Sequence, residues 1–108
     1  MMCGDFVTIA MQGDFGKPRP ALVIQANPFR EHTSVTVLPI TSTIVAAPLL
    51  RVTVPPGTEN GLKDPSQIMV DKIMTVKRSK IGATFGHIDA NTLVAVERCL
   101  AVFLGIAK

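Results

Sequence analysis

The sequence predicts a single, mainly β domain of the α+β class, with short strands followed by one C-terminal helix. Eight prolines and eight glycines are spread along the 108 residues, which favours strands and turns over a helical bundle. The last segment, 89–108, contains no proline and carries apolar residues at helical spacing. A chain of this length builds one hydrophobic core, so we expect one domain over residues 1–108.

Three strands are expected in the first half of the chain, over residues 4–11, 20–26 and 34–40. A short glycine-containing loop, 12–18, separates the first two, and Asn27-Pro28 is a turn signal after the second. Pro39 falls inside the third strand. Because proline cannot donate to a β-ladder, Pro39 predicts an edge strand or a bulge there.

Three further strands are expected in the second half, over residues 50–54, 66–71 and 73–77. Apolar and polar residues alternate in the first of them, which indicates a half-buried strand with its polar face outward. The segment 55–65 is rich in turn residues and predicts a surface loop. Gly82 and Gly86 are expected to mark turns after the last strand.

The C-terminal segment predicts a helix that begins after Asp89, whose carboxylate can cap the first turn. The helical spacing is carried by Leu93, Val96, Leu100 and Phe103. Beyond Arg98 almost every residue is apolar. A helix that is apolar on all sides must be covered on all sides, and a small sheet covers one face. The pattern therefore predicts a homodimer.

Composition points to a soluble, cytoplasmic protein. Cys3 and Cys99 lack metal-ligand spacing and are expected to be reduced thiols. Neither a signal peptide nor an apolar run of about 20 residues is present, so we expect no membrane segment. The net charge of +3 is compatible with a polyanionic partner.

Arg19 lies between Pro18 and Pro20, directly before an apolar strand. Each proline restricts its own φ, and Pro20 also favours an extended Arg19. The segment alone is compatible with a loop that leads into an edge strand. It also orients the guanidinium before any ligand binds, which suits a catalytic or binding role.

Several stretches together resemble the MazF/PemK (Kid) family of toxin–antitoxin ribonucleases, and the resemblance covers essentially the whole chain. These are Gly4-Asp5, Arg19-Pro20 followed by Ala-Leu-Val-Ile, Pro39-Ile40-Thr41-Ser42, Asp71 and Thr75 within Met-Val-Asp-Lys-Ile-Met-Thr-Val, and the apolar C-terminal helix. The resemblance implies a compact, SH3-like β-barrel with a terminal helix. It also implies a homodimer that cleaves single-stranded RNA without a metal or cofactor, and a cognate antitoxin as partner.

The resemblance also implies site residues. Arg19 and Thr41 match the catalytic arginine and threonine of the family, and Asp71 matches an aspartate that is functional in some members. Asp14 lies near an acidic residue of the first loop. The arginine that PemK-type members carry two positions before the aspartate is Met69 here, so its role does not transfer.

The chemistry of metal-independent RNA cleavage assigns roles to these residues. A guanidinium matches two phosphate oxygens and stabilises the crowded phosphorus, which suits Arg19. The Thr41 hydroxyl can bind a non-bridging or leaving oxygen, with Ser42 as a fallback. Asp71 and Asp14 remain alternative bases. Residues expected to bind RNA are Asp14, Phe15, Lys17, Ser42, Lys72, Lys77 and Arg78, with Phe15 as the best-placed stacking ring.

Other interpretations of these residues stay open from the sequence. Thr41-Ser42-Thr43 is compatible with a strand-ending turn, and Asp71 with a surface ion pair to Lys72. We expect His32 to be solvated and His87 to be structural. The main functional alternative is a CcdB-like toxin that binds and poisons DNA gyrase without catalysis, and a non-catalytic SH3-like module is a third. The Arg-Pro motif favours the ribonuclease.

Overall fold

The computed structural model describes residues 1–10 and 17–107, which form a mainly antiparallel sheet followed by one α-helix. The strands are β1 Asp5–Ala10, β2 Pro18–Val23, β3 Ser34–Thr41, β4 Arg51–Val54, β5 Ser66–Met69, β6 Met74–Lys77 and β7 Ile81–His87. The α-helix is α1 Ala90–Phe103, and short 3-10 turns are η1 Asn27–Phe29, η2 Val70–Lys72 and η3 Arg78–Lys80. This is the α+β class expected from the sequence.

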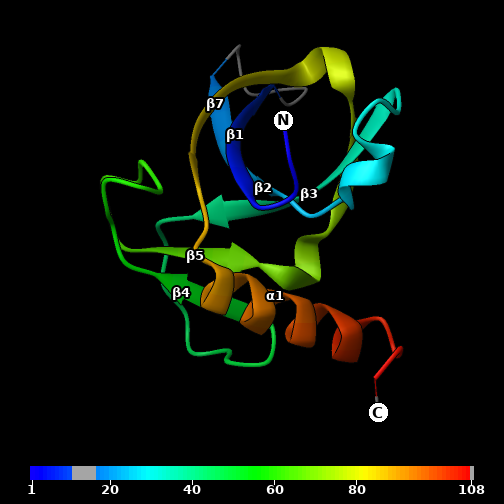
Figure 1. Ribbon diagram of the computed structural model, residues 1–108. Coiled ribbons are helices and arrows are strands. Elements are labelled where there is room, and N and C mark those ends of the chain that lie inside the picture. The colour runs from blue at the N-terminus through cyan, green and yellow to red at the C-terminus, as the bar shows by residue number, and fades with distance from the viewer. Residues whose placement is uncertain (11–16, 108) are drawn as a thin grey trace.

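The sheet order is β4-β5-β3-β2-β1-β7, with β6 paired to the first half of β3. The curved strands β1, β2 and β7 form one part of the molecule, and β4 and β5 form the other, with α1 packed beneath them (Figure 1). The long strand β3 belongs to both parts, because it pairs with β2 and β6 and then with β5. The result is a compact, SH3-like arrangement with a terminal helix.

The core has two clusters on opposite faces of the curved sheet. Phe6, Leu22 and Leu38 point to the cluster that contains Val96 of α1. Their chain neighbours point the other way, into a cluster of Val7, Ile9, Ala21, Val23, Val35 and Val37. Residues 6–7, 21–23 and 37–38 are buried on both faces of the sheet, so these parts of β1, β2 and β3 are continuously apolar rather than alternating.

Pro39 does not lie on an edge strand, so that part of the expectation is wrong. On one side β3 pairs with β2, and Pro39 lies opposite Ala21. On the other side β6 pairs with residues 34–37 and β5 with residues 40–41. Pro39 thus lies where β3 changes partners, and its missing N–H removes no ladder bond on that side.

Gly82 and Gly86 lie inside β7, so the prediction of turns at these positions is also wrong. A Cβ atom at Gly82 would collide with the Thr8 side chain, and one at Gly86 with the backbone of Asn60. The two glycines therefore allow neighbouring chain segments to approach β7 closely, which is the other common role of glycine in a strand.

Asp89 caps α1 as the sequence predicts. Its carboxylate accepts a hydrogen bond from the backbone N–H of Thr92 at 3.0 Å. The hydroxyl and backbone N–H of Thr92 together hold the pKa of Asp89 below its ordinary value. The capped N-terminus fixes where α1 begins, next to the end of β7.

The helix ends at Phe103 and does not continue to residue 108. Gly105 has a φ of +76°, and its N–H donates to the carbonyl of Val102 at 3.1 Å. The N–H of Ile106 donates to the carbonyl of Ala101 at 2.8 Å. This glycine-based cap satisfies the last carbonyls and stops the helix.

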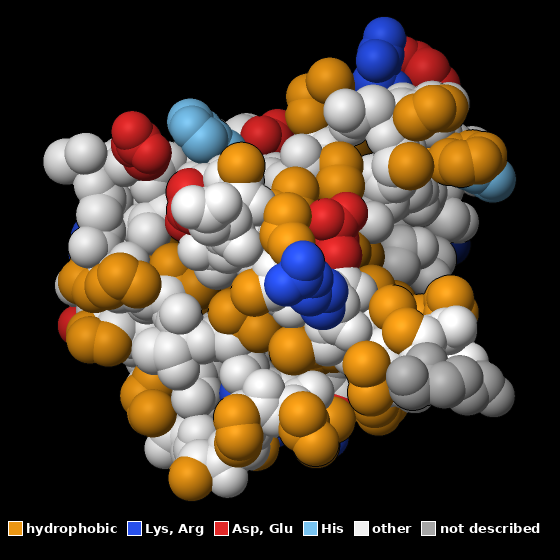
Figure 2. All heavy atoms as spheres, turned by 60° about the horizontal axis from the view of Figure 1, so that its bottom comes forward, with side chains coloured by type: hydrophobic (Ala, Val, Ile, Leu, Met, Phe, Trp, Pro, Cys, Tyr) orange, Lys and Arg blue, Asp and Glu red, His pale blue; other side chains and the backbone are white. Residues whose placement is uncertain are grey.

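Much of the apolar surface of α1 and of the residues after it is exposed. Val96 is fully buried, whereas Phe103 is 44% exposed and Ile106 is 75% exposed. Figure 2 shows this side of the molecule, with hydrophobic side chains spread over the face. Such an exposed apolar surface is the kind that a partner chain covers. No helix within the described ranges is long and apolar enough to cross a membrane.

Candidate active site

Arg19 and Thr41 line the same groove, which has a volume of about 670 Å³. Arg19 lies at the start of β2 and Thr41 at the end of β3. The two strands are antiparallel with Ala21 opposite Pro39. Extending this register by two residues puts Arg19 opposite Thr41, and cross-strand partners share a face of the sheet. The strand pairing thus brings together the two residues that were predicted to be catalytic.

A second hollow of about 430 Å³ adjoins the groove and shares Arg19 and Thr41 with it. Its other lining residues include Met69 and Lys72. Lys72 is exposed, so its ammonium is available to a polyanion that follows the groove. Ser42, a further predicted RNA-binding residue, is exposed and lines the main groove.

The Thr41 hydroxyl closes a small turn and also faces the groove. Thr41 Oγ1 accepts a hydrogen bond from the backbone N–H of Thr43 at 3.1 Å. Thr41 therefore forms the strand-ending turn and lines the groove at the same time. Because the hydroxyl oxygen accepts this bond, its proton remains available to donate to a ligand oxygen in the groove.

Part of the groove wall is formed by Gly61, Leu62, Lys63 and Asp64 of the loop between β4 and β5. The Asn60 side chain organises this loop. Its Oδ1 accepts hydrogen bonds from the N–H groups of Gly57 and Leu62, at 3.0 and 2.9 Å, and its Nδ2 donates to the Pro55 carbonyl at 2.9 Å. The long turn-rich segment is therefore an ordered wall.

Two glycines let this wall lie directly on β7. Gly61 has a φ of +69°, and a Cβ atom there would lie 2.5 Å from the carbonyl oxygen of Phe85. Gly86 faces the backbone of Asn60 just as closely. Phe85 itself lines the groove and stacks on Phe6 with ring centroids 6.0 Å apart, which provides a rigid apolar surface beside Arg19.

Lys63, Asp64 and Phe85 are groove residues that the sequence reasoning did not identify. No local pattern shows that Phe85 lies in the same groove as Lys63 and Asp64, because they come from a strand and a loop about twenty residues apart. The useful signal was the Asn60-Gly61 pair, since Asn-Gly marks a tight turn. That turn aims the following residues, Leu62 to Asp64, at the groove.

Asp71 lines neither the groove nor the adjoining hollow that Arg19 and Thr41 share. Its Oδ1 lies 3.2 Å from Nε of Arg51, and the two side chains are 20% and 16% exposed. The ion pair ties η2 to β4. The surface-pair interpretation was therefore correct in kind, but the partner is Arg51, twenty residues away, and not the neighbouring Lys72.

Lys77 and Arg78 lie at the other end of β3 from Thr41. Lys77 is opposite Ser34 in the β3–β6 register, and Arg78 Nε donates to the His32 carbonyl at 2.9 Å. Both residues line a separate hollow of about 580 Å³. They are not groove residues, so any contact they make with RNA lies beyond the groove.

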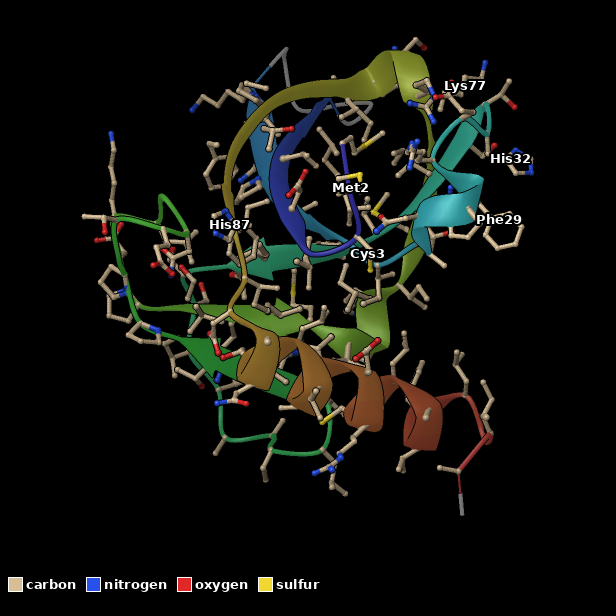
Figure 3. All side chains as sticks on the ribbon, viewed as in Figure 1. Met2, Cys3, Phe29, His32, Lys77 and His87 are labelled. Carbon is tan, nitrogen blue, oxygen red and sulfur yellow. The ribbon has the colours of Figure 1, made fainter. Side chains whose placement is uncertain are left out.

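The two histidines do not meet. Figure 3 shows His32 beside Lys77 on one side of the molecule and His87 on the other. In the described part of the chain, no group of three or more His, Cys, Asp or Glu side chains could hold a metal ion. Lys17 is exposed just before β2. The predicted residues Asp14 and Phe15 lie outside the residues that the structure describes.

Comparison with known proteins shows what this chain is similar to. Residues 2–104 match the family described as PemK-like, MazF-like toxin of type II toxin–antitoxin system. A probable endoribonuclease MazF from Mycolicibacterium smegmatis is 44% identical over 108 residues, covering 99% of each chain.

Solved structures give the same fold. Mycobacterium tuberculosis toxin MazF-mt6 superposes with a TM-score of 0.79 at 28% identity, covering 94% of this chain and 98% of that one. A mycobacterial endoribonuclease, solved in complex with its cognate antitoxin, gives a TM-score of 0.81 at 21% identity, covering 100% and 98% of the two chains.

Proposed function

Because this chain belongs to the PemK-like, MazF-like toxins of type II toxin–antitoxin systems, it is an endoribonuclease toxin, and we propose that it cleaves single-stranded RNA at specific sequences without a metal ion. The observation that carries the proposal is the shared groove of Arg19 and Thr41. We propose the cytoplasm as its place of action, because its RNA substrates are there.

In the proposed reaction the 2′-hydroxyl attacks the adjacent phosphorus. A bond from the 2′-oxygen to phosphorus forms while the bond to the 5′-oxygen breaks. The 2′-hydroxyl loses its proton to a base and the departing 5′-oxygen takes up a proton from water, which leaves a 2′,3′-cyclic phosphate and a 5′-hydroxyl. The Arg19 guanidinium stabilises the charge on the non-bridging oxygens through paired N–H donors. The Thr41 hydroxyl donates to a phosphate oxygen on the same face.

The reaction also needs a general base that removes the proton from the 2′-hydroxyl. General bases contribute about 10²–10⁴-fold to such rates. Asp71 and Asp14 are the sequence-based candidates, but Asp71 is paired with Arg51. Asp64 lines the groove itself, so it is the carboxylate whose position best supports this role among the described residues.

The gyrase-poison alternative is not supported. The matching family is one of PemK-like, MazF-like toxins, and the relative that matches at full length is a probable endoribonuclease. The groove also contains Arg19, whose proposed role in binding phosphate a gyrase binder does not require.

The proposal is tested by incubating the purified protein with a long single-stranded RNA in excess EDTA and mapping the fragment ends. We expect discrete cuts with 5′-hydroxyl ends. Absence of cuts, with growth still arrested on expression, would contradict the ribonuclease, and inhibition of DNA supercoiling would then identify the gyrase alternative.

Lys63→Ala is expected to weaken RNA binding without stopping the chemical step. Lys63 is exposed and lines the groove together with Arg19, so we expect it to neutralise one phosphate. Loss of one such contact reduces the slope of log K against log salt by about 0.7 for a single strand. The measurement is the salt dependence of affinity for 2′-O-methyl RNA. Lys80→Ala, an exposed lysine outside the groove, is the control, and an equal effect would contradict the assignment.

We also propose that the protein is a homodimer and that its antitoxin binds as a separate chain. The argument for the dimer is the exposed apolar surface at the end of α1, where Val102 is 55% and Phe103 is 44% exposed. Surfaces of this kind mark interfaces when they are contiguous.

Phe103→Asp is therefore expected to shift the protein from dimer to monomer while the fold is retained. Phe103 lies outside the core clusters, so the change should cost little stability. Sedimentation velocity measures the result. Phe29→Asp is a matched control, because Phe29 is 57% exposed on η1, away from α1. An unchanged sedimentation profile of Phe103→Asp would contradict this interface.

A further inference from the structure

Gln67 is a buried glutamine that lies beside the groove without lining it. It is 3% exposed and sits in the middle of β5. The strand registers place it opposite Thr41 on β3 and opposite Thr53 on β4. Cross-strand partners share a face, so Gln67 is flanked on its own face by the predicted catalytic threonine.

The Gln67 amide binds the backbone of Val45 at two points. Its Oε1 accepts from the N–H of Val45 at 3.1 Å, and its Nε2 donates to the Val45 carbonyl at 2.9 Å. Nε2 also donates to Thr53 Oγ1 at 3.2 Å. Both N–H donors of the amide are used, so its position and orientation are fixed.

These bonds complete the anchoring of the segment 42–45. At its start, Thr41 Oγ1 accepts from the N–H of Thr43. At its end, Gln67 holds Val45. Hydrophobic packing contributes little, because Ile44 is 50% and Val45 is 42% exposed. The hydrogen bonds therefore determine where this segment runs.

The anchored segment carries groove residues, and Gln67 does not. Ser42 and Thr43 line the groove together with Thr41, whereas Gln67 faces a separate hollow beside α1. Gln67 thus affects RNA cleavage by holding this segment and not by contact with the RNA.

We propose that Gln67 is a positioning residue for RNA cleavage, which it supports by holding the Thr41–Val45 segment in the geometry that the reaction needs. The proposal rests on the ribonuclease function proposed above. A displacement of about 1 Å in a positioned group can lower a rate by roughly 10²-fold, so loss of the amide should affect the chemical step more than binding.

Gln67→Met is the test variant, because methionine has nearly the same length and fills the same space without hydrogen-bonding the backbone. We expect kcat to fall by about 10- to 100-fold, while the affinity for 2′-O-methyl RNA stays within about threefold. Hydrogen exchange of the Val45 amide should become faster, because that N–H loses its acceptor.

Gln25→Met is the matched control. The Gln25 amide also binds backbone, donating to the carbonyls of Phe29 and Ser34 and accepting from the N–H of Thr36. Gln25→Met therefore removes the same kind of interaction at the other end of β3. We expect the parent kcat for this variant, and an equal loss in both glutamine variants would overturn the proposal.

Other results for Gln67→Met also test the proposed positioning role. An unchanged kcat in Gln67→Met, or a fall in affinity as large as the fall in kcat, overturns the proposal. If Gln67→Met does not fold, Thr53→Val replaces it, since this variant removes one bond to the amide at an exposed position. A kcat about threefold lower supports the proposal, and an unchanged kcat overturns it.

Failure of the proposed function gives a different result. A parent protein that cleaves no RNA contradicts the ribonuclease itself. The exchange rate of the Val45 amide in Gln67→Met is then still measurable, and an unchanged rate shows that the amide does not hold the segment. An active parent with an unaffected Gln67→Met contradicts this inference alone.

Discussion

Arg19→Ala is expected to abolish detectable RNA cleavage, with a fall in kcat on the order of 10³, while the protein keeps its fold. Removal of one donor that stabilises transition-state charge costs about 10²–10³, and the guanidinium provides two donors to one phosphate. Arg19 is exposed at the start of β2, so its loss should change the melting temperature little. Single-turnover cleavage and a thermal melt measure the two effects.

Two variants distinguish the hydrogen-bonding geometry of the Arg19 guanidinium from its positive charge. Arg19→Lys keeps the charge but not the planar fork, so we expect it to remain impaired by about 10². Arg30→Ala removes an equal charge from an exposed position after η1, and it should cleave like the parent. A collapse of the melt in Arg19→Ala would show a structural role, and the assignment of the site would fail.

Thr41→Val should lower kcat by about 10²-fold with little change in RNA affinity. The change replaces a hydroxyl with a methyl group of similar size, at a half-buried strand end where valine is favourable. It removes the donor to the phosphate oxygen and also the acceptor for the Thr43 N–H. Single-turnover cleavage measures the change in rate, and binding of 2′-O-methyl RNA measures the change in affinity.

Ser at the same position provides the complementary variant. Thr41→Ser keeps the hydroxyl and its bond to Thr43, so we expect most of the activity to return. Thr36→Val is the matched control on the same strand, since Thr36 lies opposite Thr75 and away from the groove. Parent-like cleavage by Thr41→Val would remove the hydroxyl from the mechanism and leave Ser42 as the remaining donor.

Arg19→Ala combined with Thr41→Val tests whether the two side chains act on the same transition state. If Arg19 stabilises charge and Thr41 donates on the same face, the double variant should be little worse than Arg19→Ala alone, because residues that act on one transition state are not additive. Independent effects that multiply would indicate that the two side chains act at different steps.

The sequence by itself determined the features that local patterns encode. Hydrophobic runs and proline positions located β1 to β6 but not β7, and they placed Arg19 at the start of β2. The Asp89 cap located the start of α1. The Arg-Pro and Thr-Ser stretches identified the family and the two residues that the strand pairing brings together. Each of these features depends on neighbours in the chain, so one sequence suffices.

The tertiary structure decided the features that depend on contacts between distant residues. Arg51 pairs with Asp71, and Gln67 binds Val45, across 20 and 22 residues. The groove wall at Lys63 depends on Gly61 lying against Phe85. Sequence periodicity shows which face of a strand is apolar. It does not show which loop lies over that face, because register and loop conformation are set by packing across the whole fold.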